Sequence, residues 1–199
     1  MKHLIFTRIF FDDKELMKKY LVLTKEILIP SLKSQSCKNF TWVLMIRKED
    51  EVLLKRELDY PFKAVYSLAE FVKYAINNNF EIQTRHDCDD WMSPNYVNAI
   101  QNQYNNNIKK WSSFLIQSQP IQRMYHTNEK KKLRAYHNKR CSMHLSLCQK
   151  TVTNHINERQ HGQMYEITPN VISLGEGFTE WVIHGDNITI KRGNLKTNN

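Results

Sequence analysis

The chain lacks any long apolar run. No window approaches the roughly 18–20 apolar residues needed to cross a membrane, and the apolar stretch at residues 3–6 is too short for a secretory signal peptide. These absences predict a cytoplasmic protein that is peripheral to a membrane at most, and a viral protein in a host cytoplasm fits the same description. The chain also has no internal repeat and no clear linker, so its 199 residues are expected to form one domain.

Cysteine and acidic residues are both scarce. The four cysteines are even in number, but without a secretory signal we expect them to be free thiols. The 20 Asp and Glu are outnumbered by 29 Lys and Arg, which gives a formal net charge of +9. A basic balance favours polyanionic partners such as nucleic acid, an anionic membrane surface or an acidic glycan.

The first hundred residues alternate between strand and helix patterns. Apolar runs of strand length lie at residues 3–6, 41–46, 62–65 and 80–84. Helical spacing and capping residues predict helices that begin after Asp13, Ser67 and Ser93, and Pro30 is expected to end or kink the first of them. This alternation predicts an α/β fold with a mostly parallel central sheet flanked by helices.

The second half of the chain gives weaker signals. Residues 113–117 and 122–125 are expected to be paired strands, residues 140–150 to be helical and residues 181–184 to form the final strand. The polar, basic tail at 191–199 is expected to fray. The predicted single domain therefore spans residues 1–190.

One segment, Arg85-His86-Asp87-Cys88-Asp89-Asp90, concentrates charged and polar side chains directly after the strand predicted at residues 80–84. Ligands of parallel sheets bind beyond the carboxyl ends of strands. Because like charges repel, three carboxylates in four positions rarely serve packing. They suit a hard divalent cation that also holds phosphate oxygens, although a solvated loop of capping aspartates is the alternative. The cluster predicts a metal-dependent enzyme that handles phosphate groups.

Two further groups of residues are candidates for a binding site. The spacings of His137, Cys141, His144 and Cys148 would place all four on one helical face, where they could hold zinc. Four ligands on one straight helix cannot surround a metal tetrahedrally, so packing against the sheet is favoured. The basic stretch at 129–140 is either a solvated face or a contact for an anionic partner, nucleic acid or lipid phosphate.

Five segments in the same order carry a resemblance to a known family. They are residues 3–8, 29–35, 40–44, 85–90 with the Asp-x-Asp motif, and 181–187. With them the chain resembles glycosyltransferases of the Rossmann-like GT-A fold, and more closely the rhamnosyltransferase family. The resemblance implies a single GT-A-like domain that binds a nucleotide-sugar.

The resemblance also implies roles for the matching positions. Asp87 and Asp89 would bridge the donor's ribose and diphosphate and a Mn²⁺ or Mg²⁺ ion, and His184 would complete the metal site. Asp90 would be a further ligand or would support the ligands. Arg85 would contact the diphosphate.

The remaining predicted site residues bind the nucleotide or take part in the transfer. Thr7 and Arg8, which follow the first strand, would face the nucleotide. Asp89 and Asp90 would act in catalysis through the metal, and an inverting enzyme would also need a general base. The candidates for that base, chosen because they lie near His184 in the sequence, are Glu176, Glu180 and Asp186.

These expectations favour a metal-dependent glycosyltransferase with a UDP- or dTDP-linked donor. Its acceptor would be a hydroxyl on a surface glycan, on a lipid-linked sugar or on a hydroxymethylated base of viral DNA. Two alternatives use the same features. Clustered carboxylates with a basic surface also suit a metal-dependent nuclease or phosphohydrolase, and the basic charge alone suits a non-catalytic nucleic-acid-binding protein.

Overall fold

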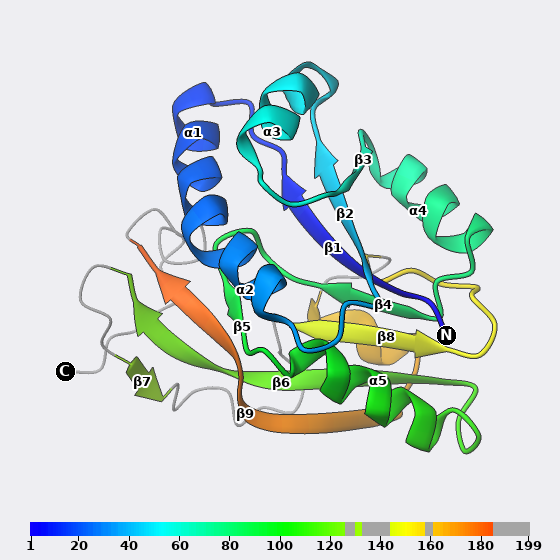
Figure 1. Ribbon diagram of the computed structural model, residues 1–199. Coiled ribbons are helices and arrows are strands. Elements are labelled where there is room, and N and C mark those ends of the chain that lie inside the picture. The colour runs from blue at the N-terminus through cyan, green and yellow to red at the C-terminus, as the bar shows by residue number, and fades with distance from the viewer. Residues whose placement is uncertain (126–129, 133–143, 158–160, 185–199) are drawn as a thin grey trace.

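A nine-stranded sheet runs through the computed structural model, which describes residues 1–125, 130–132, 144–157 and 161–184 (Figure 1). The strands are β1 (His3–Ile9), β2 (Thr41–Ile46), β3 (Lys63–Val65), β4 (Ile82–Arg85), β5 (Trp91–Met92), β6 (Ser113–Met124), β7 (Lys130–Lys132), β8 (Leu145–Gln149) and β9 (Val171–Ile183). Their order is β3-β2-β1-β4-β8-β6-β9-β5, and β7 pairs with the side of β6.

Most strands of this sheet point the same way. Strands β1 to β4 pair in parallel. Strand β8 runs antiparallel to both β4 and β6, so β6 regains the direction of β4, and β9 is parallel to β6. The reversed strands are β5, β7 and β8. The predicted α/β class with a mostly parallel sheet is confirmed, and the carboxyl ends of β1, β4 and β9 point in one direction.

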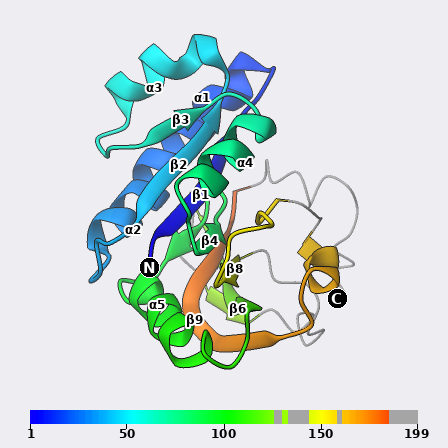
Figure 2. The same cartoon turned by 90° about the vertical axis from the view of Figure 1, so that its right-hand side faces the viewer.

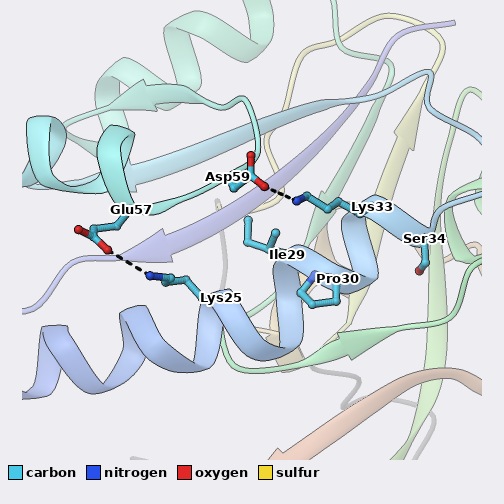
Figure 3. A pocket seen from close by; sticks show the side chains of 7 residues that line it. All are labelled: Lys25, Ile29, Pro30, Lys33, Ser34, Glu57 and Asp59. Carbon is cyan, nitrogen blue, oxygen red and sulfur yellow. Dashed lines mark hydrogen bonds and ion pairs between the residues drawn. The ribbon is translucent and has the colours of Figure 1, made fainter.

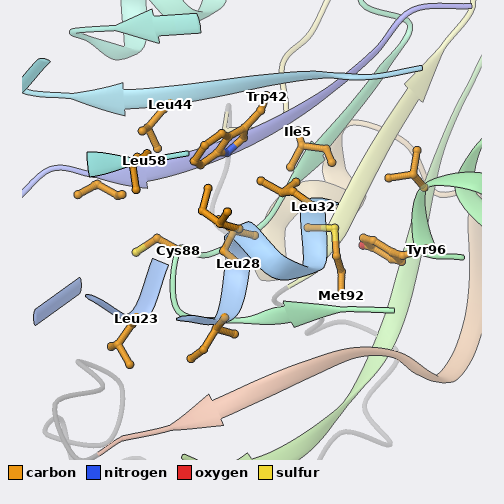
Figure 4. Packing of buried hydrophobic residues seen from close by; sticks show 14 of the residues in the cluster. Ile5, Leu23, Leu28, Leu32, Trp42, Leu44, Leu58, Cys88, Met92 and Tyr96 are labelled. Atoms are coloured by element: carbon orange, nitrogen blue, oxygen red, sulfur yellow. The ribbon is translucent and has the colours of Figure 1, made fainter. Parts of the chain in front are cut away.

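Helices cover both faces of the sheet (Figure 2). They are α1 (Lys14–Leu23), the π-helical η1 (Thr24–Leu28), α2 (Ile29–Ser34), the 3₁₀-helical η2 (Lys48–Asp50), α3 (Glu51–Glu57), α4 (Leu68–Asn77), α5 (Tyr96–Asn107) and the 3₁₀-helical η4 (His161–Glu166). One apolar core packs α1, α2 and α5 against one face (Figure 4). A smaller core packs α4 against the other face. Among the described residues, no helix combines the length and apolar composition that a membrane span requires.

Local capping chemistry begins two of the predicted helices. The Asp13 carboxylate accepts from the backbone N–H groups of Glu15 and Leu16 at 2.8 and 3.2 Å, and the Ser67 hydroxyl accepts from Glu70 N at 3.1 Å. Each cap supplies acceptors that the first helical turn lacks.

The first helix does not stop at Pro30, where an end or a kink is predicted. Proline has no N–H, and its ring crowds the carbonyl four residues earlier. The chain accommodates it by widening into the π-helical segment η1, in which Ile29 N donates to Thr24 O. The helical path then continues as α2 through Ser34.

Two predictions for the second half are wrong. Residues 113–117 and 122–125 are not paired with each other, because one continuous strand, β6, spans residues 113–124. Pro120 is tolerated there because it lies within the register shift between Gln119 and Ile121 in the pairing with β9, where a ladder N–H is not required. Residues 145–149, expected to be helical, form strand β8, and all five are buried between β4 and β6. A central strand is covered on both faces, so the polar Ser146 and Gln149 are buried together with the apolar residues of β8.

A row of buried polar side chains crosses five neighbouring strands. It joins β1, β4, β8, β6 and β9 through His3, Thr84, Ser146, Tyr96, Ser118 and Thr179. The contacts between His3 Nε2 and Thr84 Oγ1, between the hydroxyls of Thr84 and Ser146, and between those of Ser118 and Thr179 are each 2.7 Å. A slip of one residue would leave buried hydroxyls unpaired, so the row stabilises the observed register.

Candidate functional site

The acidic cluster lies in the loop that leads from β4 to β5, and this loop also contacts β9. His86 N donates to Phe6 O at 2.9 Å, which continues the ladder between β1 and β4 by one bond. Trp91, directly after the cluster, pairs with Glu180 of β9. Between these anchors Cys88 is buried in the larger apolar core (Figure 4), and burial raises the pKa of its thiol. The loop is therefore held at both ends and in its middle.

Asp89 and His184 come together from two distant segments of the chain. The Asp89 Oδ2 and His184 Nε2 atoms are 2.9 Å apart, although the residues are 95 positions apart in the sequence. The Tyr20 ring of α1 contacts the imidazole edge-on, with 5.5 Å between the ring centroids. Burial raises the pKa of Asp89, and the hydrogen bond with His184 opposes that shift.

Asp90 lies deeper than Asp89 and is 1% exposed. Its Oδ1 accepts from Val182 N at 2.9 Å, and its Oδ2 lies 2.9 Å from His144 Nε2. Burial, followed by the negative charges of Asp89 and Asp87, raises the pKa of Asp90. Both oxygens of this buried carboxylate are thus in contact with protein groups.

Asp87, Arg85 and Arg8 form the more open part of the site. The Asp87 side chain is 42% exposed, and Arg85 Nε lies 4.0 Å from its Oδ1. Burial lowers the pKa of Arg85, the positive charge of Arg8 lowers it further, and Asp87 opposes both effects. Two guanidinium groups beside one carboxylate leave an excess of positive charge, which suits a phosphate group.

The other predicted nucleotide contact, Thr7, is fully buried. Its hydroxyl accepts from Trp42 Nε1 at 3.0 Å, so it packs within the sheet. Its surroundings do not favour contact with a nucleotide.

The three candidates for a general base are placed very differently. Glu180 is buried, and its Oε2 forms an ion pair with Arg123 Nε at 3.1 Å. Glu176 is exposed, pairs with Gln119 of β6 and lies eight residues before His184 in the sequence. At about 3.3 Å per residue that separation reaches up to roughly 26 Å along a strand. Asp186 lies outside the described residues.

The spacing of Asp89 and His184 suits two ligands of one divalent ion. Octahedral ligands about 2.1 Å from a Mg²⁺-like ion lie about 3.0 Å from their neighbours, which matches the 2.9 Å between Asp89 Oδ2 and His184 Nε2. Within the part of the chain that the structure describes, no third His, Cys, Asp or Glu joins such a group. The predicted ligand Asp87 is thus not gathered with the pair. The two donors fit an ion that takes its other ligands from water and substrate phosphates, as Mg²⁺ commonly does.

A cleft of about 570 Å³ lies elsewhere, beside α2 (Figure 3). Its charged groups are already paired, with 3.1 Å between Lys25 Nζ and Glu57 Oε2 and 2.6 Å between Lys33 Nζ and Asp59 Oδ2. None of the predicted site residues lines it. The cleft is therefore separate from the candidate site.

Of the four residues considered for zinc, the structure describes two. His137 and Cys141 lie outside the described residues, and His144 and Cys148 lie on or beside strand β8 rather than on a helix. His144 instead contacts Asp90, a partner that sequence reasoning missed. No short sequence pattern predicts the contact between His144 and Asp90, because it depends on where β8 lies in the sheet.

No protein-family model matches the chain, and no curated protein matches its sequence. Among solved structures, residues 1–349 of S. aureus TarS in complex with UDP-GlcNAc match with a TM-score of 0.50 and 9% identity. The match covers 94% of this chain and 60% of that one, so this chain spans about three fifths of that structure. A cytidylyltransferase from Leptospira borgpetersenii matches with a TM-score of 0.48 and 11% identity, over 89% of this chain and 76% of that one.

These comparisons concern the fold. At 9% identity, the likeness to TarS shows a shared architecture. Together with the strand order, it defines a mixed α/β protein with a Rossmann-like, GT-A-like fold. The comparisons give no specific support to the rhamnosyltransferase family.

Proposed function

We propose that this protein is a metal-dependent glycosyltransferase that moves a sugar from a nucleotide donor to a hydroxyl group. The observation that carries this proposal is the Asp89–His184 pair at the carboxyl ends of β4 and β9. In sheets of this kind, ligands bind at such ends. The GT-A-like fold supports the proposal, and TarS, which shares that fold, is in complex with UDP-GlcNAc. A UDP-linked donor is therefore proposed ahead of a dTDP-linked one.

The described residues would contact different parts of the donor and its metal ion. Asp89 and His184 would hold Mn²⁺ or Mg²⁺, which supplies charge neutralisation for the departing diphosphate. Arg85 and Arg8 would bind the diphosphate oxygens, because a guanidinium can donate two parallel hydrogen bonds to a phosphate. Asp87, exposed beside them, would orient the donor's ribose as the family resemblance implies.

The general base is proposed by comparing the three candidates. Glu180 is already engaged by Arg123, and Glu176 lies far along β9. Asp186, two residues after His184 in the sequence, therefore stays the predicted base for an inverting transfer. The acceptor is proposed to be an anionic or nucleic-acid-linked hydroxyl, in keeping with the net charge of +9.

Thermal unfolding with Mn²⁺ and UDP, GDP, dTDP or CDP tests the donor site. A ligand at ~100 times its dissociation constant stabilises by about 2.7 kcal/mol, which raises Tm by roughly 5–11 °C for a chain of this size. We expect that shift with UDP only when metal is present, and Asp89→Asn should abolish it. The matched control is Asp59→Asn, which removes a carboxylate on the separate cleft and should keep the shift.

Two results would contradict the proposal. One is the absence of a metal-dependent shift with any of the four nucleotides. The other is an equal shift in Asp89→Asn and the unmodified protein. Degradation of DNA with Mg²⁺ and without a sugar donor would favour the nuclease alternative.

A further inference from the structure

Asp90 and His144 form a buried pair directly behind the proposed metal ligands. His144 is fully buried, and its Nε2 lies 2.9 Å from Asp90 Oδ2. We propose that this is a positioning pair, which holds Asp89 at the correct distance from His184. The inference rests on the proposed function and assigns a role to His144, a residue outside the Asp-x-Asp motif.

The pair joins three separate parts of the chain. Asp90 belongs to the loop after β4, and His144 directly precedes β8. The second Asp90 oxygen accepts from Val182 N, two residues before His184 on β9. One carboxylate thus connects the loop that carries Asp89 to the strand that carries His184.

The surroundings restrict how this carboxylate can move. A buried carboxylate is strongly destabilising unless its oxygens are hydrogen-bonded, so both contacts favour a single rotamer. The His86 ring stacks on the His144 ring, with 4.7 Å between centroids and 23° between planes. His86 in turn lies at the end of β4, where its N–H extends the ladder to β1. The imidazole is therefore held from two sides.

Loss of the His144 contact should reach the metal site through this arrangement. Asp90 Oδ2 would lose its hydrogen-bond partner. The loop would then no longer keep Asp89 Oδ2 at 2.9 Å from His184 Nε2. In metal proteins, loss of a residue that orients a ligand typically lowers metal affinity by about 10- to 100-fold. A positioning role predicts a loss in this range without complete unfolding.

The experiment measures Mn²⁺-dependent UDP affinity by calorimetry in four proteins. These are the unmodified protein, His144→Leu, His144→Gln and, as a matched control, His3→Leu, which also removes a buried histidine but one that contacts Thr84 and Gln101 rather than a residue of the Asp90–His144 pair. We expect about 10- to 100-fold weaker binding in His144→Leu and recovery to within about threefold in His144→Gln. A glutamine amide can reach the place of Nε2 and donate to Asp90. Binding in His3→Leu should be unchanged.

The outcomes separate this inference from the proposed function. Unmodified protein that binds no UDP with metal would refute the proposed function, and the positioning role with it. Normal UDP binding in His144→Leu would refute the positioning role alone, as would an equal loss in His3→Leu. Should His144→Leu fail to fold, His144→Asn replaces it, because that shorter amide cannot reach Asp90, and the same loss is expected.

Discussion

His3 should make the stability of this protein depend on pH, and His3→Gln should remove that dependence. The imidazole is 2% exposed at the start of β1, and burial lowers its pKa from 6.5 to about 3. Its polar neighbours are neutral: Thr84 Oγ1 lies 2.7 Å from Nε2, and Gln101 Nε2 lies 3.4 Å from Nδ1. The folded protein therefore keeps this histidine uncharged at pH values where the unfolded chain protonates it.

The sign and size of the effect follow from linkage. The part of the folding stability that depends on a neutral His3 is fully present above pH 6.5. It declines as the pH falls below that value and is lost by about pH 3. Between pH 7.5 and 5.0, protonation of one such histidine in the unfolded chain lowers the free energy of unfolding by about 2 kcal/mol. Buried His86 and His144, whose pKa values are also lowered, add the same pH dependence to the unmodified protein and to His3→Gln, so the difference between the two proteins reports His3.

Urea unfolding at pH 7.5, 6.0 and 5.0 measures this contribution. His3→Gln should lose about 2 kcal/mol less than the unmodified protein between the two extremes. Thr84→Val is the matched control, because it removes the hydrogen bond to His3 but keeps the buried imidazole. It should lower stability by a similar amount at every pH. Parallel pH profiles for His3→Gln and the unmodified protein would refute the reasoning.

Three further changes test the fold by urea unfolding at pH 7.5. Asp13→Ala removes the cap of α1 and should cost about 1 kcal/mol; an unchanged midpoint would contradict the capping role. Phe71→Ala empties a fully buried site against Phe6 and should cost about 3–5 kcal/mol, so a loss below 1 kcal/mol would be evidence against tight packing there. Gly177→Ala should cost about 1–2 kcal/mol, because its φ of +88° disfavours a side chain although space is open; a neutral result would argue against that conformation.

Local patterns predicted the first half of the fold well because its determinants are close in sequence. Strands β1 and β2 contain clear apolar runs, and each strand from β1 to β4 is followed by a helix or a turn before the next. The caps Asp13 and Ser67 bond to groups two or three residues away. The acidic cluster was located by the same means, because it directly follows β4.

The second half depends on contacts that no local pattern contains. Residues 140–150 were predicted to be helical, but the place of β8 between β4 and β6 gives residues 145–149 a strand conformation. The same insertion brings His144 to Asp90 across 54 residues. His184 was predicted from the family resemblance, whereas the ion pair that engages Glu180 depends on the alignment of β6 with β9. Register across strands is set by tertiary packing, which a single sequence does not display.

The late position of β8 in the chain also bears on how the protein assembles during synthesis. Strands β3, β2, β1 and β4 are complete by residue 85, but the neighbour of β4 is not made until residues 145–149. Until then the edge of β4 presents unpaired backbone groups, which are a template for pairing with other chains. A nascent chain that stalls between these points would expose that edge, so translation through residue 149 is the step that ends its exposure to aggregation.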